Sequence, residues 1–289
     1  MLVCKEFLQS GLCDRILEIF ILSVYLKFLE EDLAIVWPPF IFDNITFSPW
    51  RKYDTNLETI LSFFKFPGNI QLVPSLDPTL ASSPELPHLL YGFQISPAKL
   101  YETYLSGIEK DEYMKIVDTV KSEFKLVLDD YVPNEPYIVI HIRRTDKIVD
   151  DKSNDGFRIP ESKLNNLEVE TQNAIRHAFA IGHRNVYIAS DDPLKKIEYQ
   201  SFAQDVGFTI LELENTTPFP PSYFDLWVMK SASLIIQSSY YTTFSLVPCV
   251  LWNRPLWVVL EDSKVFDYGF AKMSSIQYYK NVQLSSLGV

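Results

Sequence analysis

The stretch Tyr137-Ile-Val-Ile-His-Ile-Arg-Arg-Thr-Asp146 determines how this chain is expected to fold. It begins with an almost continuous apolar run, which is typical of a strand buried on both faces in a parallel sheet. Arg143 and Arg144 follow where this strand ends, and because side chains alternate along a strand, they should point to opposite faces. One guanidinium can then bind a phosphate group bidentately while the other pairs with a carboxylate such as Asp146. A surface arginine pair within a salt-bridge network is the alternative.

The rest of the second half alternates between strand-like and helical patterns. We expect strands at residues 185–190, 208–213, 233–237 and 256–260, and helices at residues 168–181, 193–205, around 225–231 and from about 242. This alternation predicts an α/β domain, in which helices cover both faces of a parallel sheet. Ligands of such sheets bind beyond the carboxyl ends of the strands, which is where Arg143 lies.

The first part of the chain shows a less regular α/β pattern. We expect a strand within residues 1–8, a turn at Gly11, a helix at residues 16–29, strands at 33–37 and 71–73, and a helix at 99–128. A chain of 289 residues is long enough for two domains. We therefore expect one Rossmann-like domain at residues 1–132 and another at residues 133–289, with a last helix that could pack back on the first domain.

Polar residues also follow two of the other expected strands. They are Ser190, Asp191 and Asp192 after one strand, and Ser238, Ser239 and the hydroxyl residues up to Ser245 after another. Parallel strands share one carboxyl edge, so these residues should converge with Arg143 on a polar crevice that suits a diphosphate. The two aspartates could instead cap the helix that starts at Pro193, and the hydroxyl residues could cap the next helix.

The amino-acid composition argues against several kinds of binding partner. The net charge of −11 argues against nucleic-acid binding, because neutralising phosphates requires clustered cations with little opposing charge. The three cysteines are scattered, which indicates neither a disulfide framework nor a structural zinc site. The apolar segment at residues 16–29 contains Glu18 and Lys27 and is too short to span a bilayer. We therefore expect a soluble, cytoplasmic protein without a membrane anchor.

Three motifs in the second half together resemble those of the α-1,6-fucosyltransferases and, more loosely, of the α-1,2- and protein O-fucosyltransferases. They are His141-Ile-Arg-Arg-Thr-Asp-Lys147, Tyr187-Ile-Ala-Ser-Asp-Asp-Pro193, and Asp225-Leu-Trp227 followed by Leu234-Ile-Ile-Gln-Ser-Ser239. Gly11-Leu-Cys-Asp-Arg15 is a weaker match to the family's first loop, whose usual second glycine is Cys13 here. The resemblance implies a GT-B fold, with two Rossmann-like domains facing a central cleft. The first domain would bind the acceptor and the second the nucleotide sugar.

The resemblance also implies a set of residues that bind the sugar donor. They are His141, Arg143, Arg144, Ser190, Asp191, Asp225, Ser238, Ser239, Gly11 and Arg15. Arg143 would hold the β-phosphate with Arg144 in support, and His141 would lie near the diphosphate and the sugar. Asp225 would accept hydrogen bonds from the guanine ring of GDP. Alternatively, Asp225 could cap the helix that it is expected to begin.

Inverting sugar transfer needs a base that takes the proton of the acceptor hydroxyl, and a carboxylate is the usual choice. The position that matches the acidic base of the α-1,6 family is Asp151, and Asp150 beside it could raise its pKa. Arg143 would complete the catalytic set by stabilising the leaving diphosphate. A solvated loop carboxylate is the alternative for Asp151. Because the sequence has no Asp-x-Asp triplet of the kind that binds a metal, we expect neither a metal nor a cofactor.

We thus expect an inverting, metal-independent glycosyltransferase that moves fucose from GDP-fucose to a glycan hydroxyl. One alternative keeps the fold but uses another nucleotide sugar, such as UDP-xylose, because a few side chains decide donor specificity. Another is a non-catalytic module that binds a glycan or a nucleotide. An oxidoreductase is disfavoured, because the first loop offers only Gly11 where a dinucleotide fingerprint needs three glycines.

Overall fold

The chain divides into two compact units in the computed structural model. One unit comprises Met1–Asp130 with Tyr268–Lys272, and the other comprises Tyr131–Asp267 with Met273–Val289. The structure describes residues 1–5, 7, 11–37, 56–86, 107–127, 133, 135–145, 148–150, 159–215, 219–239, 242–260, 276–280 and 283–285. The assignment of acceptor binding to the first unit and donor binding to the second stays a prediction.

The first unit is built on a parallel sheet with the strand order β1-β2-β4. These strands are β1 (Leu2–Cys4), β2 (Leu33–Val36) and β4 (Ile70–Val73), and α1 (Leu12–Phe28) connects the first two. The expected β-α-β beginning is therefore confirmed, although α1 starts before residue 16 because Leu12 and Cys13 are also buried.

The remaining elements of the first unit are short apart from one helix. They are α2 (Leu57–Phe63), β3 (Phe64–Lys65), α3 (Pro78–Ala81), α5 (Lys110–Glu123) and β5 (Lys125–Leu126), with β3 and β5 paired antiparallel. An ion pair between Lys27 of α1 and Glu123 of α5 joins the two long helices. The ring centroids of Phe20 and Phe124 lie 6.2 Å apart beside it.

The second unit contains a seven-stranded sheet with the order β10-β9-β6-β11-β12-β13-β14. Its strands are β6 (Tyr137–Ile142), β9 (Asn185–Ser190), β10 (Thr209–Ile210), β11 (Leu234–Ser238), β12 (Leu256–Val259), β13 (Ile276–Lys280) and β14 (Gln283–Ser285). All neighbours are parallel except β13 and β14. The chain builds outward from β6 to β10, returns to β11 on the other side of β6, and continues outward. The order therefore reverses between β6 and β11, which makes this pair the topological switch point of the sheet.

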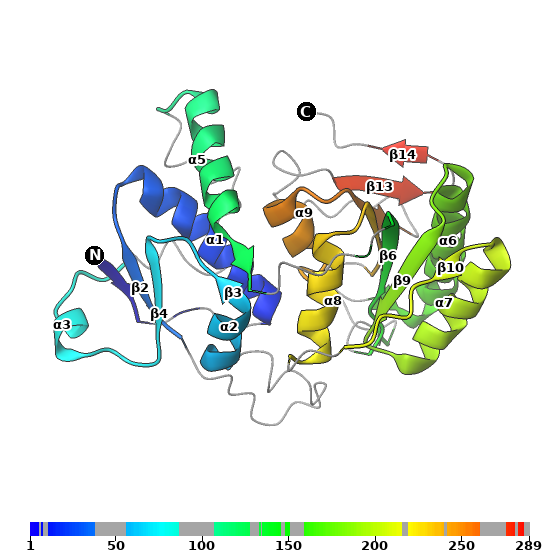
Figure 1. Ribbon diagram of the computed structural model, residues 1–289, viewed down its shortest axis with the longest axis horizontal. Coiled ribbons are helices and arrows are strands. Elements are labelled where there is room, and N and C mark those ends of the chain that lie inside the picture. Colours follow the sequence, from blue (N-terminus) through cyan, green and yellow to red (C-terminus); the bar gives the residue numbers. More distant parts are fainter. Residues whose placement is uncertain are drawn as a thin grey trace. The chain divides into compact units, whose positions relative to one another are not determined.

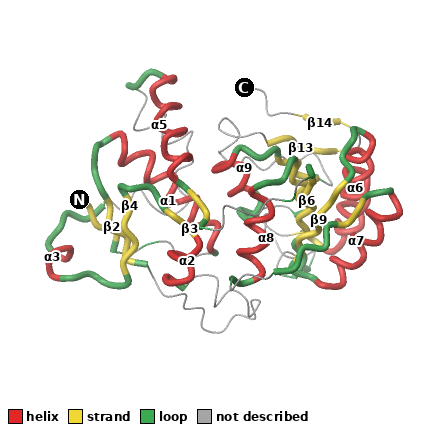
Figure 2. Tube along the Cα trace, viewed as in Figure 1, coloured by secondary structure: helices red, strands yellow, loops and turns green. Residues whose placement is uncertain are grey.

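Helices cover both faces of this sheet, as the alternating pattern predicts (Figures 1 and 2). They are α6 (Glu161–Ala180), α7 (Pro193–Val206), α8 (Pro221–Lys230) and α9 (Leu246–Trp252). Ile138, Ile140 and Ile142 of β6 belong to the apolar core shared with α6 and α7. On the opposite face, the hydroxyl of Tyr137 donates to the carbonyl of Val228 in α8 over 2.7 Å. A short parallel pair, β7 (Ile148–Val149) and β8 (Ile159–Pro160), precedes α6.

Several expected elements differ from the structure. The helix expected at residues 99–128 is α5, which spans only Lys110–Glu123, and the chain continues as the strand β5 rather than as helix. α8 begins at Pro221 rather than near Asp225, because consecutive prolines preset the backbone of its first turn. α9 begins at Leu246 rather than near residue 242. The last helix is not found among the described residues after Leu260, which form β13 and β14; residues 261–275 lie outside the described part of the chain.

None of the described helices combines the length and the apolarity that are required to cross a bilayer.

Gly207 ends α7 with a φ of 112°, and a Cβ atom there would lie 2.8 Å from Cζ of Phe179. Gly207→Ala should therefore lower the free energy of unfolding by at least about 2 kcal/mol, from the backbone conformation and the steric clash together. Gly182→Ala is the matched control, because Gly182 has a φ of 111° but no atom within 4 Å of the added Cβ. Urea unfolding should show the larger loss at Gly207, and equal losses would show that the contact with Phe179 is unimportant.

Candidate functional site

The candidate site lies at the carboxyl edge of the second sheet, around the switch point. Ser238 of β11 pairs with Ile142 of β6, and Ile142 pairs with Ser190 of β9, so the three strands end at the same level. The polar segments that follow them begin at Arg143, Asp191 and Ser239. The expected convergence of the three strand ends is therefore present.

Arg143 and Arg144 point to opposite faces, as their alternation along the chain predicts. Nη1 of Arg143, which is half-buried, lies 3.4 Å from Oγ1 of Thr242 in the segment between β11 and α9. Arg144 is only 2% exposed, and its Nε donates to Oε1 of Glu168 in α6 over 3.0 Å. One arginine thus lies on the side of α9, and the other is buried against α6.

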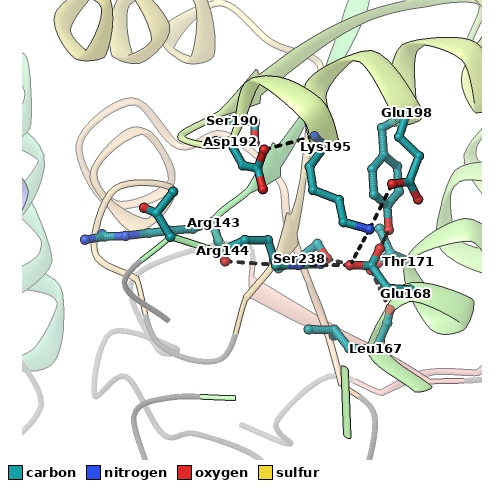
Figure 3. A network of polar contacts seen from close by, with 12 residues as sticks. Arg143, Arg144, Leu167, Glu168, Thr171, Ser190, Asp192, Lys195, Glu198 and Ser238 are labelled. Atoms are coloured by element: carbon teal, nitrogen blue, oxygen red, sulfur yellow. Dashed lines mark hydrogen bonds and ion pairs between the residues drawn. The ribbon is translucent and has the colours of Figure 1, made fainter. Parts of the chain in front are cut away.

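The guanidinium of Arg144 joins β6, β11 and α6 across the switch point (Figure 3). Its Nη1 donates to the carbonyl of Ser238, and its Nη2 donates to Oγ of Ser238 over 2.7 Å. Oγ of Ser238 lies 2.6 Å from Oγ1 of Thr171, whose own hydroxyl donates to the carbonyl of Leu167. All three nitrogens of Arg144 therefore donate to protein acceptors.

The carboxylate of Glu168 interacts with two cations and one hydroxyl group. In addition to Arg144, it accepts a hydrogen bond from the hydroxyl of Tyr199, and Nζ of Lys195 lies 3.5 Å from its Oε1. Lys195 also pairs with Glu198 at 2.9 Å. Burial alone would raise the pKa of Glu168, but the charge of Arg144, the hydrogen bonds and Lys195 together hold that pKa below its usual range. Glu168 is therefore ionised at neutral pH.

The carboxylate of Asp191 ties the segment after β6 to the end of β9. Its Oδ1 accepts from the backbone N–H of Arg144 at 2.9 Å, and its Oδ2 accepts from the hydroxyl of Thr145 at 2.5 Å. Asp192 caps α7, because its Oδ1 accepts from the backbone N–H of Leu194 at 2.9 Å. The capping alternative is thus confirmed for Asp192. The hydroxyl of Ser190 is close by and accepts from the N–H of Asp192 at 3.1 Å.

His141 is nearly buried on the side of the sheet that α8 and α9 cover. Its Nδ1 lies 2.5 Å from Oγ of Ser245, and the centroid of its ring lies 5.1 Å from that of Phe244. Burial lowers the pKa of His141 to about 3, and the charges of Arg143 and Arg144 contribute in the same direction. The imidazole is therefore neutral at physiological pH.

Asp225 lies on the same side of the sheet, within α8. The N-cap of α8 is Pro220, so the capping alternative for Asp225 is wrong. Its Oδ1 accepts from the hydroxyl of Tyr187 at 2.6 Å. Burial raises the pKa of Asp225 to about 6, although the hydrogen bond from Tyr187 and the charge of Lys196 act in the opposite direction. Its Oδ2 has no hydrogen-bond partner among the residues that the structure describes.

Ser239 follows β11 and is fully buried, and within the described part of the chain its hydroxyl has no hydrogen-bond partner. Asp150 is exposed after β7, whereas Asp151 and Asp146 lie outside the described residues. The described residues contain no group of three or more His, Cys, Asp or Glu side chains that could hold a metal ion.

Gly11 and Arg15 belong to the first unit. Gly11 precedes α1 with a φ of −60°, a conformation that any residue can adopt. Arg15 is fully buried, and its guanidinium carbon lies 4.7 Å from the centroid of the Trp37 ring. The donor-binding role of both residues stays a prediction.

No family model matches the sequence, and no curated protein matches it. Among solved structures, the fucosyltransferase NodZ from Bradyrhizobium is similar, with 12% sequence identity and a TM-score of 0.50 over 87% of this chain and 93% of that chain. The chain has the fold of this fucosyltransferase. The predicted α/β fold of the GT-B type, with two Rossmann-like units, is therefore confirmed.

Two further structures match most of the chain. NodZ α-1,6-fucosyltransferase soaked with GDP-fucose shares 12% identity over 88% of this chain and 93% of that chain, with a TM-score of 0.49. POFUT1 in complex with GDP-fucose shares 13% identity over 89% of this chain and 96% of that chain, with a TM-score of 0.44.

Three of the residues that the resemblance assigns to donor binding have protein partners for their polar groups. Arg144, Ser238 and Asp191 were expected to contact the donor, but their polar side-chain groups are engaged with protein partners at the switch point. This arrangement favours a positioning role for them, in which they hold the edge that carries Arg143. From the sequence, Glu168 was not identified, and Ser245 was placed only among the hydroxyl residues after the strand, not as the partner of His141, because each meets its partner only through tertiary packing.

Replacing Glu168 with glutamine should remove the charge that compensates the buried Arg144. We expect Glu168→Gln to lower the free energy of unfolding by about 3 kcal/mol at pH 7, the typical cost of breaking a buried ion pair. Because the folded-state pKa of Glu168 is lowered, the wild-type advantage is present above the ordinary carboxyl pKa and disappears as the pH falls through the lowered value.

Glu198→Gln is the control, because Glu198 is 52% exposed and contacts only Lys195 of the same network. Urea unfolding at a series of pH values should show a small, nearly constant effect of this change. An effect as large as that of Glu168→Gln would contradict the special role of the pair between Glu168 and Arg144.

Proposed function

We propose that this protein is a glycosyltransferase that transfers fucose from GDP-fucose to a hydroxyl group of a glycan. The observation that carries the proposal is the placement of His141, Arg143 and Asp225 on one side of the sheet, with His141 and Arg143 at its switch point and Asp225 beside the neighbouring strand β9. A nucleotide bound to an open parallel sheet lies in this position. The fold of NodZ, which is itself a fucosyltransferase, supports the same activity.

In this proposal the diphosphate of the donor lies against Arg143 and the hydroxyl of Ser239. Of the two arginines after β6, Arg143 is the one that is not buried against α6, and a planar guanidinium can bind phosphate oxygens bidentately. The buried hydroxyl of Ser239 has no partner among the described residues, so a phosphate oxygen would satisfy it. Arg143 and Ser239 would thus provide a local binding site for the anionic diphosphate, although the protein as a whole is acidic.

The guanine ring is assigned to Asp225. An ionised carboxylate can accept from both N1–H and N2–H₂ of guanine, whereas uracil offers a single N–H. Tyr187 occupies one oxygen of Asp225 and orients the carboxylate, and the other oxygen is available within the described part of the structure. This arrangement favours GDP over UDP as the nucleotide of the donor.

The reaction would proceed by displacement at the anomeric carbon. As the bond from this carbon to the β-phosphate oxygen breaks, negative charge grows on GDP, and Arg143 stabilises that charge most in the transition state. The acceptor hydroxyl attacks from the opposite face, so the configuration inverts, and a base takes its proton. Asp151 is proposed as this base, with Asp150 as its neighbour. The cytoplasmic location also stays a prediction.

Arg143→Lys should lower turnover of GDP-fucose by roughly a hundredfold or more, because lysine keeps the charge but loses the planar pair of donors. The measurement is release of GDP in the presence of glycan acceptors. Arg176→Lys is the matched control, because Arg176 lies exposed on α6 and should tolerate the same change. Wild-type turnover in Arg143→Lys would contradict the bidentate phosphate contact.

The same assay tests metal independence. If Arg143 supplies the positive charge, EDTA should leave the activity largely intact. Loss of activity with EDTA and its recovery with Mn²⁺ would contradict this part of the proposal.

Calorimetric titration should show that GDP binds roughly tenfold to a hundredfold more tightly than UDP, because the wrong base leaves the Asp225 carboxylate unpaired. With a pKa of about 6, Asp225 must lose its proton to accept from guanine, so GDP affinity should fall as the pH drops below that value. Asp225→Asn should lose both the preference for GDP and this pH dependence. Equal or tighter binding of UDP to the wild type would instead favour a UDP-linked sugar as the donor.

A further inference from the structure

His141 and Ser245 form a hydrogen-bonded pair beside the candidate phosphate site. Oγ of Ser245 lies 2.5 Å from Nδ1 of His141, and both side chains are more than nine-tenths buried. Ser245 directly precedes α9, yet its side chain does not cap that helix. The pair connects β6 to the segment after β11, on the same side of the sheet as Arg143.

The environment decides which of the two groups donates the hydrogen bond. Apart from His141, the hydroxyl of Ser245 has no hydrogen-bond acceptor among the described residues, so within this part of the chain donation to Nδ1 is what satisfies its proton. The opposite arrangement, in which Nδ1–H donates to Oγ, would leave a buried hydroxyl proton without an acceptor. Because burial and two neighbouring arginines keep the pKa of His141 near 3, only one ring nitrogen carries a proton.

We propose that Ser245 is a positioning residue that holds His141 in the neutral tautomer protonated at Nε2, which makes His141 a hydrogen-bond donor to the bound nucleoside diphosphate sugar. The identity of this ligand rests on the proposed function, whereas the tautomer does not. Nε2 makes no hydrogen bond to any described residue, so its proton is available to a ligand. A diphosphate presents only acceptor oxygens on this side, and a protonated Nε2 is complementary to them.

This assignment also separates the roles of the polar residues at the site. A neutral imidazole with a protonated Nε2 and an occupied Nδ1 has no free lone pair with which to take a proton from the acceptor hydroxyl. His141 therefore orients the donor, and a carboxylate must serve as the base. The opposite tautomer would direct a lone pair at an anionic oxygen, which is repulsive.

The tautomer can be measured directly in the wild-type protein. The chain has four histidines, so a sample with ¹⁵N-labelled histidine gives few ring signals, and the loss of one set in His141→Asn identifies those of His141. Protonated and unprotonated ring nitrogens resonate far apart. We expect Nε2 to be protonated and Nδ1 unprotonated, without change between pH 5 and 8. A protonated Nδ1, or titration of this ring within that range, would overturn the proposal.

Ser245→Ala tests whether Ser245 maintains the tautomer. We expect the His141 signals to shift toward a mixture of tautomers, and the affinity for GDP to fall by about fivefold, the typical worth of one net hydrogen bond. Ser23→Ala is the matched control, because Ser23 is also fully buried and its hydroxyl donates to the carbonyl of Ile19 over 2.7 Å in the first unit. This control should leave the His141 signals and the GDP affinity unchanged.

The outcomes distinguish this inference from the proposed function. If His141 is protonated at Nε2 and depends on Ser245, but GDP and GDP-fucose do not bind, the positioning role stands and the proposed ligand is wrong. If GDP-fucose is turned over while Ser245→Ala leaves the tautomer unchanged, the proposed function stands and the role of Ser245 is rejected.

Discussion

The buried guanidinium of Arg144 is the constraint on which the geometry of the site depends. A cation that is 2% exposed would be very costly without compensation, so the surrounding chain must supply acceptors for it. Glu168 supplies the charge, and Ser238 supplies a carbonyl and a hydroxyl. Because these acceptors belong to α6 and β11, satisfying Arg144 brings the two strands of the switch point and one covering helix into a single arrangement. Arg143 lies between the end of β6 and Arg144, so the same contacts also hold its backbone in place.

The two faces of the second sheet carry polar groups of different kinds: those on one face bind other parts of the protein, and those on the other are proposed to bind the ligand. On the side of α6 and α7, the network around Glu168 is closed, since each charged group there has an opposite charge beside it. On the side of α8 and α9, several groups keep hydrogen-bonding capacity for which the described residues offer no partner: Nε2 of His141, Oδ2 of Asp225 and the hydroxyl of Ser239. The face whose polar groups all have protein partners thus supports the face whose polar groups can still bind a ligand. Preorganised binding requires such an arrangement.

The two arginines also determine the electrostatics of their surroundings, although the chain carries a net charge of −11. Their charges reinforce the effect of burial on His141 and keep its imidazole neutral, whereas Arg144 keeps the carboxylate of Glu168 ionised. Asp225, whose only described hydrogen-bond partner is the neutral hydroxyl of Tyr187, has a raised pKa instead. Local burial and neighbouring charges, rather than the overall charge, therefore set the protonation state of each group.

The α/β class, the strands β6 and β9, and the opposite directions of Arg143 and Arg144 could be predicted from the sequence. These follow from local periodicity, because a continuous apolar run forms a buried strand and successive side chains alternate across it. The partners of these residues could not be predicted, because they depend on how the chain packs. Glu168 lies 24 positions from Arg144, and Ser245 lies 104 positions from His141, so no local pattern connects them. Glu168 reaches Arg144 because α6, which lies between β6 and β9 in the chain, packs back against the sheet. Ser245 reaches His141 because the strand order reverses between β6 and β11, which brings the segment after β11 beside β6.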